Sequence, residues 1–449
     1  MIPPDLQSYL GQLEERGWLA HVKREVDPKF ELPGVLIRLM AQGKAAVFER
    51  VKGSEFGAVG NVCVTRDMLA LALGCERDEV PRVWRDRTEK LIPPEIVKTG
   101  PVKDVIKIGD KARFTDLPIC WHSEKDAGPF ITASVTVASD PESGLRNISF
   151  NRMQLRDARE TGIRSMPPQH LGLMHSRAEQ RGKPLEVAVA IGLHPIELCA
   201  AATSPPHGVD ELAIAGALRG EPVQLVKCET IDAYAPAHAE IVLEGEILPG
   251  RREREAPFGD FMQFYMPEVM SPIFRLKAIT HRKGALYQDM QAGCDDDMHV
   301  LAPSREAQVF DALERAGIRV KAVSLLPTIL GVAVSIHKQF EREGKNAAMV
   351  ALGSYRWAKT CIVVDHDVDV YNYADVLWAF TTRCRPDQGT FVVPEAMGFP
   401  RDNFHIHQSK MGIDATAPMG EWTEFERKQV PGAAELRLED YVEGIGHRA

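Results

Sequence analysis

The chain has 449 residues, of which 44% are hydrophobic and 26% are charged, and its formal net charge is −9. This length suffices for two or three domains with their own cores, whereas the charge and the lack of a Lys/Arg cluster argue against a basic nucleic-acid-binding protein. The eight cysteines form no CxxC pair, which argues against a zinc knuckle or disulfide framework and predicts a reducing, cytoplasmic location. No secretory signal begins the sequence and polar residues interrupt its most apolar stretch, so no membrane contact is expected.

Residues 1–105 are predicted to form a small α/β unit. Apolar residues recur at helical spacing in its first two helices, and Gly17 and Gly43 mark where these helices end. The expected elements are helices at 5–15, 32–42 and 67–73 and strands at 18–23 and 45–48.

Residues 106–300 have a different pattern, in which Pro and Gly separate short apolar segments. Many short strands with such turn signals are typical of a β-barrel or sandwich. Two helices interrupt them, one over 168–181 with Pro168 in its first turn and Gly182 at its end, and one that begins near Asp210 and ends at Gly220. The expected strands lie at 131–138, 147–154, 185–191, 222–228, 239–248 and 273–281.

Residues 301–449 return to an α/β pattern. Ser304 caps a helix that Gly317 ends. Further elements are expected as strands at 320–325, 328–335 and 361–364 and helices at 346–352 and 374–383. The prediction for the whole chain is therefore a multi-domain α/β protein with a central β-barrel-like domain.

The segment 147–154 is unusual because it combines strand-like alternation with amide, hydroxyl and guanidinium groups. Asn147 and Arg152 are five residues apart, which puts them on opposite faces of a regular strand. One ligand can therefore contact both only across the strand end or at a β-bulge. The alternative is a solvated outer face of an antiparallel strand.

The two helices of the central region begin at Gln169-His170 and Asp210-Glu211. Helix N-termini favour phosphate, because they present unpaired N–H groups and the positive end of the helix dipole. Together with Asn147, His170 and Glu211 form a mixed N/O set that suits Mn²⁺ or Mg²⁺, with a phosphate oxygen and water completing the shell. An ordinary role as first-turn polar residues is the alternative, and spacing alone does not bring the three together.

The segment Glu-Ala-Pro-Phe-Gly-Asp at 255–260 holds two carboxylates on a stretch that Pro257 and Gly259 stiffen. Two close carboxylates favour protonation of one, and an arginine such as Arg152 keeps the other ionised. A solvated acidic loop is the alternative. The sequence contains no GxGxxG, P-loop, HExxH or GxSxG motif, which argues against the usual nucleotide-binding, zinc-protease and serine-hydrolase classes.

Six short motifs extend over nearly the whole chain in one order: Asn147 to Arg152, Gln169-His170, Gly-Val-Asp-Glu at 208–211, Lys-Cys-Glu-Thr at 227–230, the 255–260 segment, and Ser-Lys-Met-Gly-Ile-Asp-Ala-Thr at 409–416. This order resembles the UbiD family of prenylated-FMN-dependent decarboxylases. The resemblance implies a prenylated-FMN-binding split β-barrel domain at 106–300, between an N-terminal α/β region (1–105) and a C-terminal α/β domain with an oligomerisation tail (301–449).

The resemblance also implies a set of site residues. Asn147, His170 and Glu211 would hold Mn²⁺ and, through it, the cofactor phosphate, and K⁺ would lie on backbone carbonyls of 201–203. Arg152, Glu255 and Asp260 would form the network at the reacting centre, where some family members have Glu in place of the second acid. Contacts to prenylated FMN are implied for Asn147, Ile148, Ser149, Phe150, Asn151, Arg152, Gln169, His170, Glu211 and Lys359.

The implied activity is reversible, non-oxidative decarboxylation of an aromatic, heteroaromatic or α,β-unsaturated carboxylic acid. Loss of CO₂ from an sp² carbon needs an electron sink that side chains do not supply, which agrees with a cofactor enzyme. Met166 and Phe261 are candidates for an apolar substrate wall, with core packing as the alternative. A flavin prenyltransferase would supply the cofactor, and a homodimer or larger homo-oligomer is expected.

Two other functions remain open at this stage. One is the polyprenyl-hydroxybenzoate decarboxylase of quinone biosynthesis, which needs a pocket long enough for an isoprenoid tail. The other is a non-decarboxylating split-barrel flavoprotein, for which the Glu255 and Asp260 pair would have no use.

Overall fold

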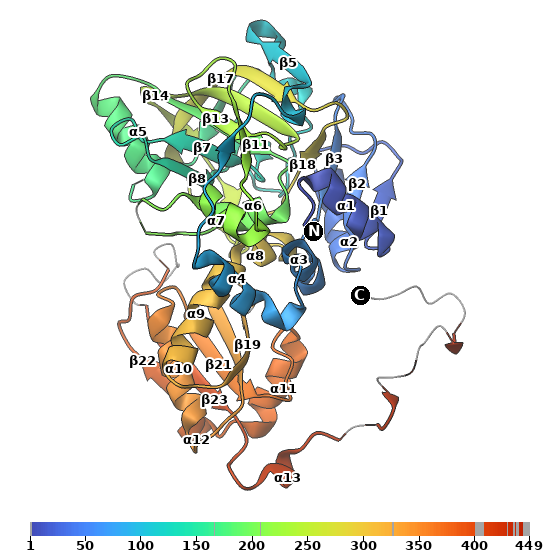
Figure 1. Cartoon of the computed structure of the whole chain (residues 1–449), viewed down its shortest axis with the longest axis vertical. Coiled ribbons are helices and arrows are strands. Elements are labelled where there is room, and N and C mark those ends of the chain that lie inside the picture. The colour runs from blue at the N-terminus through green and yellow to red at the C-terminus, as the bar shows by residue number, and fades with distance from the viewer. Residues whose placement is uncertain are drawn as a thin grey trace. The chain divides into compact units, whose positions relative to one another are not determined.

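The computed structural model describes residues 2–165, 167–206, 208–325, 327–399, 408–428, 430–433, 436 and 440–442. The chain forms two compact units, one from residues 1–74 and 87–300 and the other from 75–86 and 301–449 (Figure 1). The predicted α/β class with a central curled sheet is confirmed. The division into three domains stays a prediction.

The first unit begins with the expected α/β region. Asp5 caps the first helix by accepting a hydrogen bond from the Ser8 amide at 2.8 Å. The sheet of this region gains a fourth strand from far along the sequence, because Leu286–Gln288 pairs in parallel with Gly57–Gly60. The helices are α1 (Leu6–Glu15), α2 (Glu31–Met40) and α3 (Arg66–Leu73), and the strands follow the order β1 (Leu19–Val22), β2 (Ala45–Phe48), β3 (Gly57–Gly60), β18 (Leu286–Gln288).

The centre of the first unit is a nine-stranded sheet in which every pairing is antiparallel. Its buried face carries a continuous aliphatic and aromatic core. The strand order is β6 (Phe130–Ile131), β9 (Met153–Leu155), β10 (Glu160–Ile163), β17 (Val269–His281), β14 (Ile241–Glu255), β11 (Leu185–Ile191), β7 (Val135–Ser139), β8 (Arg146–Phe150), and β5 (Val105–Ile108) pairs with β17.

One bent hairpin connects the two edges of this sheet and curls it into a half-barrel. The strands predicted at 131–138 and 147–154 are each divided, into β6 and β7 and into β8 and β9, with β6 paired to β9 and β7 paired to β8. The segment between Ile131 and Val135 lies opposite the shorter segment between Phe150 and Met153, and this difference in length forms a β-bulge. The prediction of two continuous strands was therefore wrong, because the curl of the sheet interrupts the strand pairing where the polar residues Asn151 and Arg152 lie.

Helix α5 packs on this sheet through Leu171, Met174 and Ala178, whose spacing of three and four residues puts them on one helical face. It begins at His170, with Gln169 as N-cap, so Pro168 precedes the helix instead of lying in its first turn. Helix α7 begins at Glu211 as predicted and ends at Gly220, which has a φ of 86°. The helices of this part are α5 (His170–Gln180), α6 (Pro195–Ala201), α7 (Glu211–Arg219) and α8 (Asp295–Leu301).

Two small sheets complete the first unit. The strand predicted at 222–228 is present, but it belongs to a separate three-stranded sheet. The acidic segment 255–260 leads from the long strand β14 into a two-stranded hairpin. The strands are β4 (Glu95–Ile96), β12 (Gln224–Lys227), β13 (Tyr234–Pro236), β15 (Phe258–Gly259) and β16 (Tyr265–Met266), and the 3-10 helices are η2 (Pro101–Lys103), η3 (Gly109–Lys111) and η4 (Phe114–Asp116).

The second unit is a five-stranded sheet with helices, as predicted for the C-terminal region. Three central strands are parallel and the two edge strands are antiparallel to their neighbours. The strand order is β19 (Val320–Leu325), β20 (Gly331–Ile336), β21 (Thr360–Asp365), β23 (Lys410–Ala415), β22 (Thr390–Val393). The helices are η1 (Arg77–Glu79), α9 (Pro303–Arg315), α10 (Glu343–Ser354), α11 (Tyr373–Arg383), α12 (Pro386–Gly389) and α13 (Trp422–Phe425). Helix α4 (Val80–Thr88) leads into the first unit.

All eight cysteines are free thiols. In the part of the chain that the structure describes, no helix has both the length and the apolar character needed to cross a bilayer.

Candidate active site

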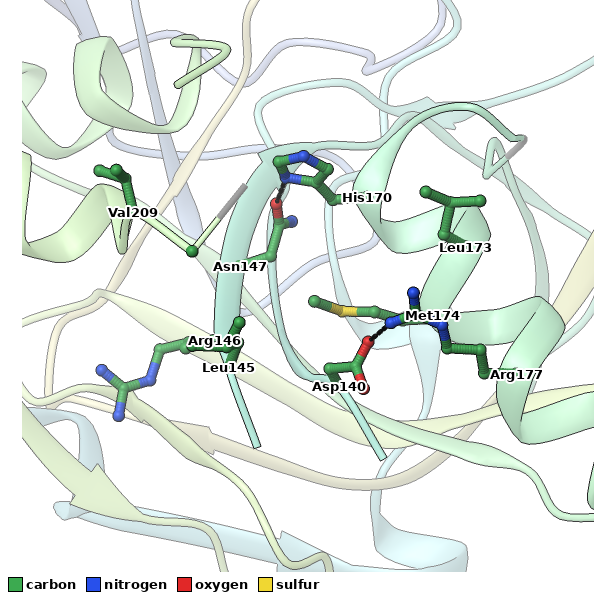
Figure 2. Close-up of a pocket in the computed structure, with 10 residues that line it drawn as sticks. Asp140, Leu145, Arg146, Asn147, His170, Leu173, Met174, Arg177 and Val209 are labelled. Carbon is green, nitrogen blue, oxygen red and sulfur yellow. Dashed lines mark hydrogen bonds and ion pairs between the residues drawn. The ribbon is translucent and has the colours of Figure 1, made fainter. Parts of the chain in front are cut away.

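Asn147 and His170 meet near the start of strand β8, where helix α5 begins. The His170 Nδ1 atom lies 3.0 Å from the Asn147 Oδ1 atom, and Figure 2 shows the two side chains directed toward each other from the strand and the helix. His170 is the first residue of α5, so its ring stands beside the unpaired N–H groups of the helix N-terminus.

Glu211 approaches the same strand from helix α7. Its Oε2 atom accepts a hydrogen bond from the Ile148 amide at 3.0 Å, and its side chain is buried, with 2% of the residue exposed. Burial raises the pKa of Glu211 to about 7, and the Ile148 amide only partly offsets this effect. A divalent cation beside this carboxylate would hold it ionised.

The structure therefore places the three predicted metal ligands on one stretch of β8 and on the first residues of two helices. An amide oxygen, an imidazole nitrogen and a carboxylate form a donor set of the type that Mn²⁺ accepts. Burial, together with the neighbouring Asp210 charge, raises the pKa of the Glu211 carboxyl group, and a divalent cation would offset both effects. The residues fit a divalent metal, and the metal assignment stays a prediction.

The pocket at Asn147 and His170 contains two arginines that the sequence analysis did not identify. Arg146 is 2.9 Å from the Asp210 carboxylate, and Arg177 forms an ion pair with Asp140. Arg177 lies seven residues after His170, on the same face of α5, and this spacing was a usable signal. The pocket is lined by Asp140, Leu145, Arg146, Asn147, His170, Leu173, Met174, Arg177, Gly208 and Val209.

The rest of the predicted cofactor segment is held by hydrogen bonds along the strand. Asn147 Nδ2 donates to Ser149 Oγ at 3.2 Å, and Ser149 Oγ donates to Asn151 Oδ1 at 3.0 Å. Ile148 is buried on the opposite face, whereas Phe150 is half-buried. These contacts fix the polar row next to the bulge.

Three other predicted contacts stand apart from this row. Gln169 is the N-cap of α5, without a capping hydrogen bond from its side chain. Lys359 belongs to the second unit, where its amide donates to the Leu330 carbonyl at 2.7 Å. Residues 201–203 form the end of α6, with Ala201 as its last residue and Ala202 as its C-cap, and the last carbonyls of a helix favour a cation. Their roles toward prenylated FMN and K⁺ stay predictions.

Arg152 and Glu255 form a buried ion pair at the bulge. Arg152 Nε donates to Glu255 Oε1 at 2.8 Å, and the side chains are 10% and 0% exposed. The guanidinium also lies 4.6 Å from the centre of the Phe258 ring. Arg152 Nη2 and Glu255 Oε2 are also buried and have no hydrogen-bond partner among the described residues.

Asp260 lies at the turn of the hairpin that follows Glu255. It is 3% exposed, its Oδ1 atom accepts a hydrogen bond from the Met262 amide at 2.7 Å, and its own amide donates to the Phe264 carbonyl at 2.9 Å. Both acids are therefore buried. This excludes the alternative of a solvated acidic loop.

A third buried acid, Asp126, supports this hairpin and was not identified from the sequence. Its Oδ1 atom accepts from the Gly259 amide and its Oδ2 atom from the Ser123 amide, both at 2.8 Å. Asp126 and Gly259 are far apart in the sequence, so no spacing could reveal the contact.

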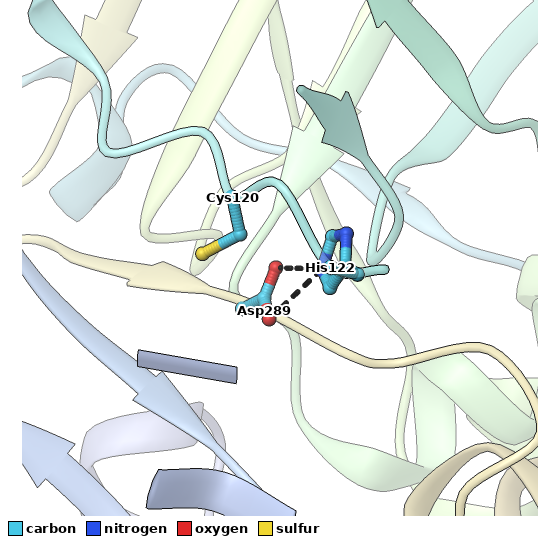
Figure 3. Close-up of side chains that lie close together, drawn as sticks. All are labelled: Cys120, His122 and Asp289. Carbon is cyan, nitrogen blue, oxygen red and sulfur yellow. Dashed lines mark hydrogen bonds and ion pairs between the residues drawn. The ribbon is translucent and has the colours of Figure 1, made fainter. Parts of the chain in front are cut away.

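A charged pair lies on the segment that carries Asp126. His122 Nε2 is 2.9 Å from the Asp289 carboxylate, and Cys120 lies beside them (Figure 3). Burial acts to lower the pKa of His122, but the Asp289 charge outweighs it and the pKa is raised. Burial, with Asp289, raises the pKa of the Cys120 thiol well above its usual value. The group is therefore a buried, hydrogen-bonded histidine–aspartate pair beside a buried thiol.

The apolar wall predicted from Met166 and Phe261 is only partly described. Met166 lies outside the described residues. Phe261 is half-buried on the hairpin turn, where its backbone packs against Gly293. Any Cβ at Gly293 would come within 2.8 Å of the Phe261 carbonyl, so this glycine permits the close approach.

The chain matches three family models, all described as domains of 3-octaprenyl-4-hydroxybenzoate carboxy-lyase. Residues 10–88 match the N-terminal domain, 95–294 the Rift-related UbiD domain and 299–415 the C-terminal domain. The chain belongs to the UbiD family. The resemblance first seen in six short motifs is thereby confirmed.

Relatives of known structure or name agree with this family. The anhydromevalonate phosphate decarboxylase of Methanothermobacter thermautotrophicus is 33% identical, over 94% of this chain and 99% of its own length. The FMN complex of the UbiD-class enzyme HmfF from Pelotomaculum thermopropionicum has a TM-score of 0.91 and 37% identity, with 98% of this chain and 100% of that one covered. An evolved dimeric form of HmfF in complex with prenylated FMN gives 0.89 and 36%, with the same shares covered.

Proposed function

We propose that the protein is a reversible, non-oxidative decarboxylase of an aromatic, heteroaromatic or α,β-unsaturated carboxylic acid, with prenylated FMN as its cofactor. That it is a carboxy-lyase of the UbiD family follows from the family match. The observation that supports the finer proposal most is the buried Arg152–Glu255 ion pair, together with the buried carboxyl group of Asp260 on the segment that follows Glu255.

The cofactor phosphate and Mn²⁺ are assigned to the pocket of Asn147 and His170. The donor set, the α5 N-terminus and the buried Glu211 carboxylate support this assignment, because a cation and a phosphate there satisfy each other's charge. Ile148, Ser149, Phe150, Asn151, Arg152, Gln169 and Lys359 complete the proposed contacts, and the 201–203 turn is proposed to hold K⁺. When bound, prenylated FMN supplies the electron sink for the carbanion that loss of CO₂ leaves.

Arg152 orients the substrate carboxylate. Its Nε atom is committed to Glu255, so its terminal Nη groups are the donors that can hold a carboxylate oxygen. The buried surroundings exclude water, which strengthens this contact and favours departure of neutral CO₂. Glu255 thus acts as the anchor that fixes the guanidinium in one direction.

Asp260 holds the proton that the product carbon receives. Its position one residue beyond the β15 strand, with its Oδ1 atom tied to the Met262 amide, keeps the carboxyl group in a narrow range of orientations. A proton delivered by such a fixed acid accounts for typically 10²- to 10⁴-fold in rate. Asp260 is therefore assigned as the general acid and Glu255 as its neighbour.

The experiment that tests this function is co-expression with a flavin prenyltransferase. The purified protein should contain prenylated FMN by mass and absorbance and Mn²⁺ by elemental analysis. It should then release CO₂ from at least one acid in a panel that includes anhydromevalonate phosphate, a polyprenyl-hydroxybenzoate and small unsaturated and aromatic acids. A cofactor-loaded protein that reduces or oxidises pyridine nucleotides but releases no CO₂ would instead support the split-barrel flavoprotein alternative.

A further inference from the structure

Asp126 connects two segments at the reacting centre that are distant in the sequence. Both of its carboxylate oxygens accept backbone amides, Oδ1 from Gly259 and Oδ2 from Ser123, each at 2.8 Å. A second bond, from the Ala127 amide to the Pro257 carbonyl at 2.9 Å, joins the same two segments. Residues 123–127 are therefore fastened to the strand that leads into Asp260.

The packing around this connection leaves little room for the hairpin to move. The centres of the Phe130 and Phe258 rings lie 4.7 Å apart, and the Arg152 guanidinium lies 4.6 Å from the centre of the Phe258 ring. A Cβ at Gly259 would come within 3.3 Å of Ser123 Oγ. Gly259 therefore packs closely against the segment that carries Asp126.

Burial and the neighbouring polar groups act on the carboxyl group of Asp126 in opposite directions. Burial raises the pKa of Asp126 above its ordinary value, and the Gly259 and Ser123 amides, with the charges of His122 and Arg152, offset only part of this rise. His122 is in turn fixed by Asp289 (Figure 3). The acid is 4% exposed, so its bonds are little weakened by solvent.

We propose that Asp126 is a positioning residue for the general acid: it fixes the Gly259 amide, and thereby sets the direction of the Asp260 carboxylate relative to the Arg152–Glu255 pair. This inference rests on the proposed function, because it assigns Asp126 a part in proton delivery. Asp126 acts through the hairpin backbone and need not touch the substrate.

Two substitutions separate positioning from simple packing. Asp126→Ala removes both acceptors, so the Gly259 amide loses a bond to a charged group. Asp126→Asn keeps one acceptor oxygen and places an amide donor toward the other N–H group, so it should rescue part of the effect. Asp157→Ala is the matched control, because Asp157 is an exposed turn aspartate in the same unit that also accepts two backbone amides, from Arg159 and Glu160.

The first measurement is hydrogen–deuterium exchange of the full chain without flavin. In Asp126→Ala the amides of 258–264 should exchange about 10- to 10²-fold faster, as expected for a lost bond to a charged acceptor. The Asp157→Ala variant should leave that segment unchanged. Unchanged exchange over 258–264 in Asp126→Ala would overturn the inference without any reference to activity.

The second measurement is steady-state decarboxylation by the cofactor-loaded enzyme. We expect kcat to fall about 10²-fold in Asp126→Ala and about 10-fold in Asp126→Asn, with KM and cofactor content close to those of the unmodified protein. A variant that loses only thermal stability and retains kcat would overturn the inference and leave the proposed function intact. If the unmodified holoenzyme releases no CO₂ from any acid, the proposed function fails and the inference fails with it.

Discussion

Replacement of Glu255 by alanine should destabilise the first unit strongly. The Arg152 guanidinium is 10% exposed, and its Nε atom loses the carboxylate that accepts its hydrogen bond at 2.8 Å. Removal of one partner from a buried pair costs about 3–5 kcal/mol, because the remaining charge stays out of water without compensation. Glu255→Gln keeps an acceptor oxygen and loses only the charge, so it should cost about half as much.

The neighbouring pair Arg254–Glu268 provides the control. Its Arg254 Nε and Glu268 Oε1 atoms lie 2.5 Å apart, but the side chains are 75% and 48% exposed, so Glu268→Ala should cost at most about 1 kcal/mol. The assay is urea unfolding of the flavin-free protein followed by tryptophan fluorescence. Equal losses in Glu255→Ala and Glu268→Ala would refute the argument that burial makes the Arg152–Glu255 pair distinct.

Two further predictions concern the phosphate pocket and pH. Glu211→Ala should give folded protein depleted of both Mn²⁺ and prenylated FMN, as measured by elemental analysis and absorbance. The control variant Glu221→Ala, just beyond the same helix, should retain both. Retention of both by Glu211→Ala would contradict the metal assignment. The Arg252 guanidinium lowers the pKa of Glu179 to about 2, so this pair stabilises the fold above the ordinary glutamate value of 4.5 and the benefit is lost as the pH falls toward 2. Glu179→Gln should therefore lower the melting temperature at pH 7 and have little effect near pH 2, and an equal effect at both would contradict the assigned cause.

The parts of the site that the sequence predicted best are those set by local structure. The helix start at Glu211 follows from Asp210, whose side chain accepts the Leu212 amide at 2.9 Å. The alternation around Ile148 and Phe150 likewise predicted a half-buried strand. Such signals come from neighbouring residues, so a single sequence contains them.

The parts that it did not predict depend on contacts between distant residues. The bulge at Asn151 and Arg152 arises because one hairpin joins both edges of a curled sheet, and the local pattern gives no sign of that closure. In the sequence Asp126 reads as an ordinary loop aspartate, and only the fold places the Gly259 amide within hydrogen-bond distance of it. Charge reasoning offered Arg152 as a partner for the two acids and the family resemblance implied it, but spacing does not show that Arg152 and Glu255 meet.

The central claim is that Asp260 delivers a proton to the carbon that loses CO₂. Its most direct test is solvent deuterium exchange at that carbon, compared between the unmodified holoenzyme and Asp260→Asn protein whose prenylated FMN is verified by mass. The amide keeps the shape of the side chain and an oxygen for the Met262 amide but cannot act as the acid. We expect Asp260→Asn to retain metal and cofactor while exchange and turnover fall by about 10² to 10⁴. Exchange and turnover close to the unmodified level in that cofactor-loaded variant would contradict the account.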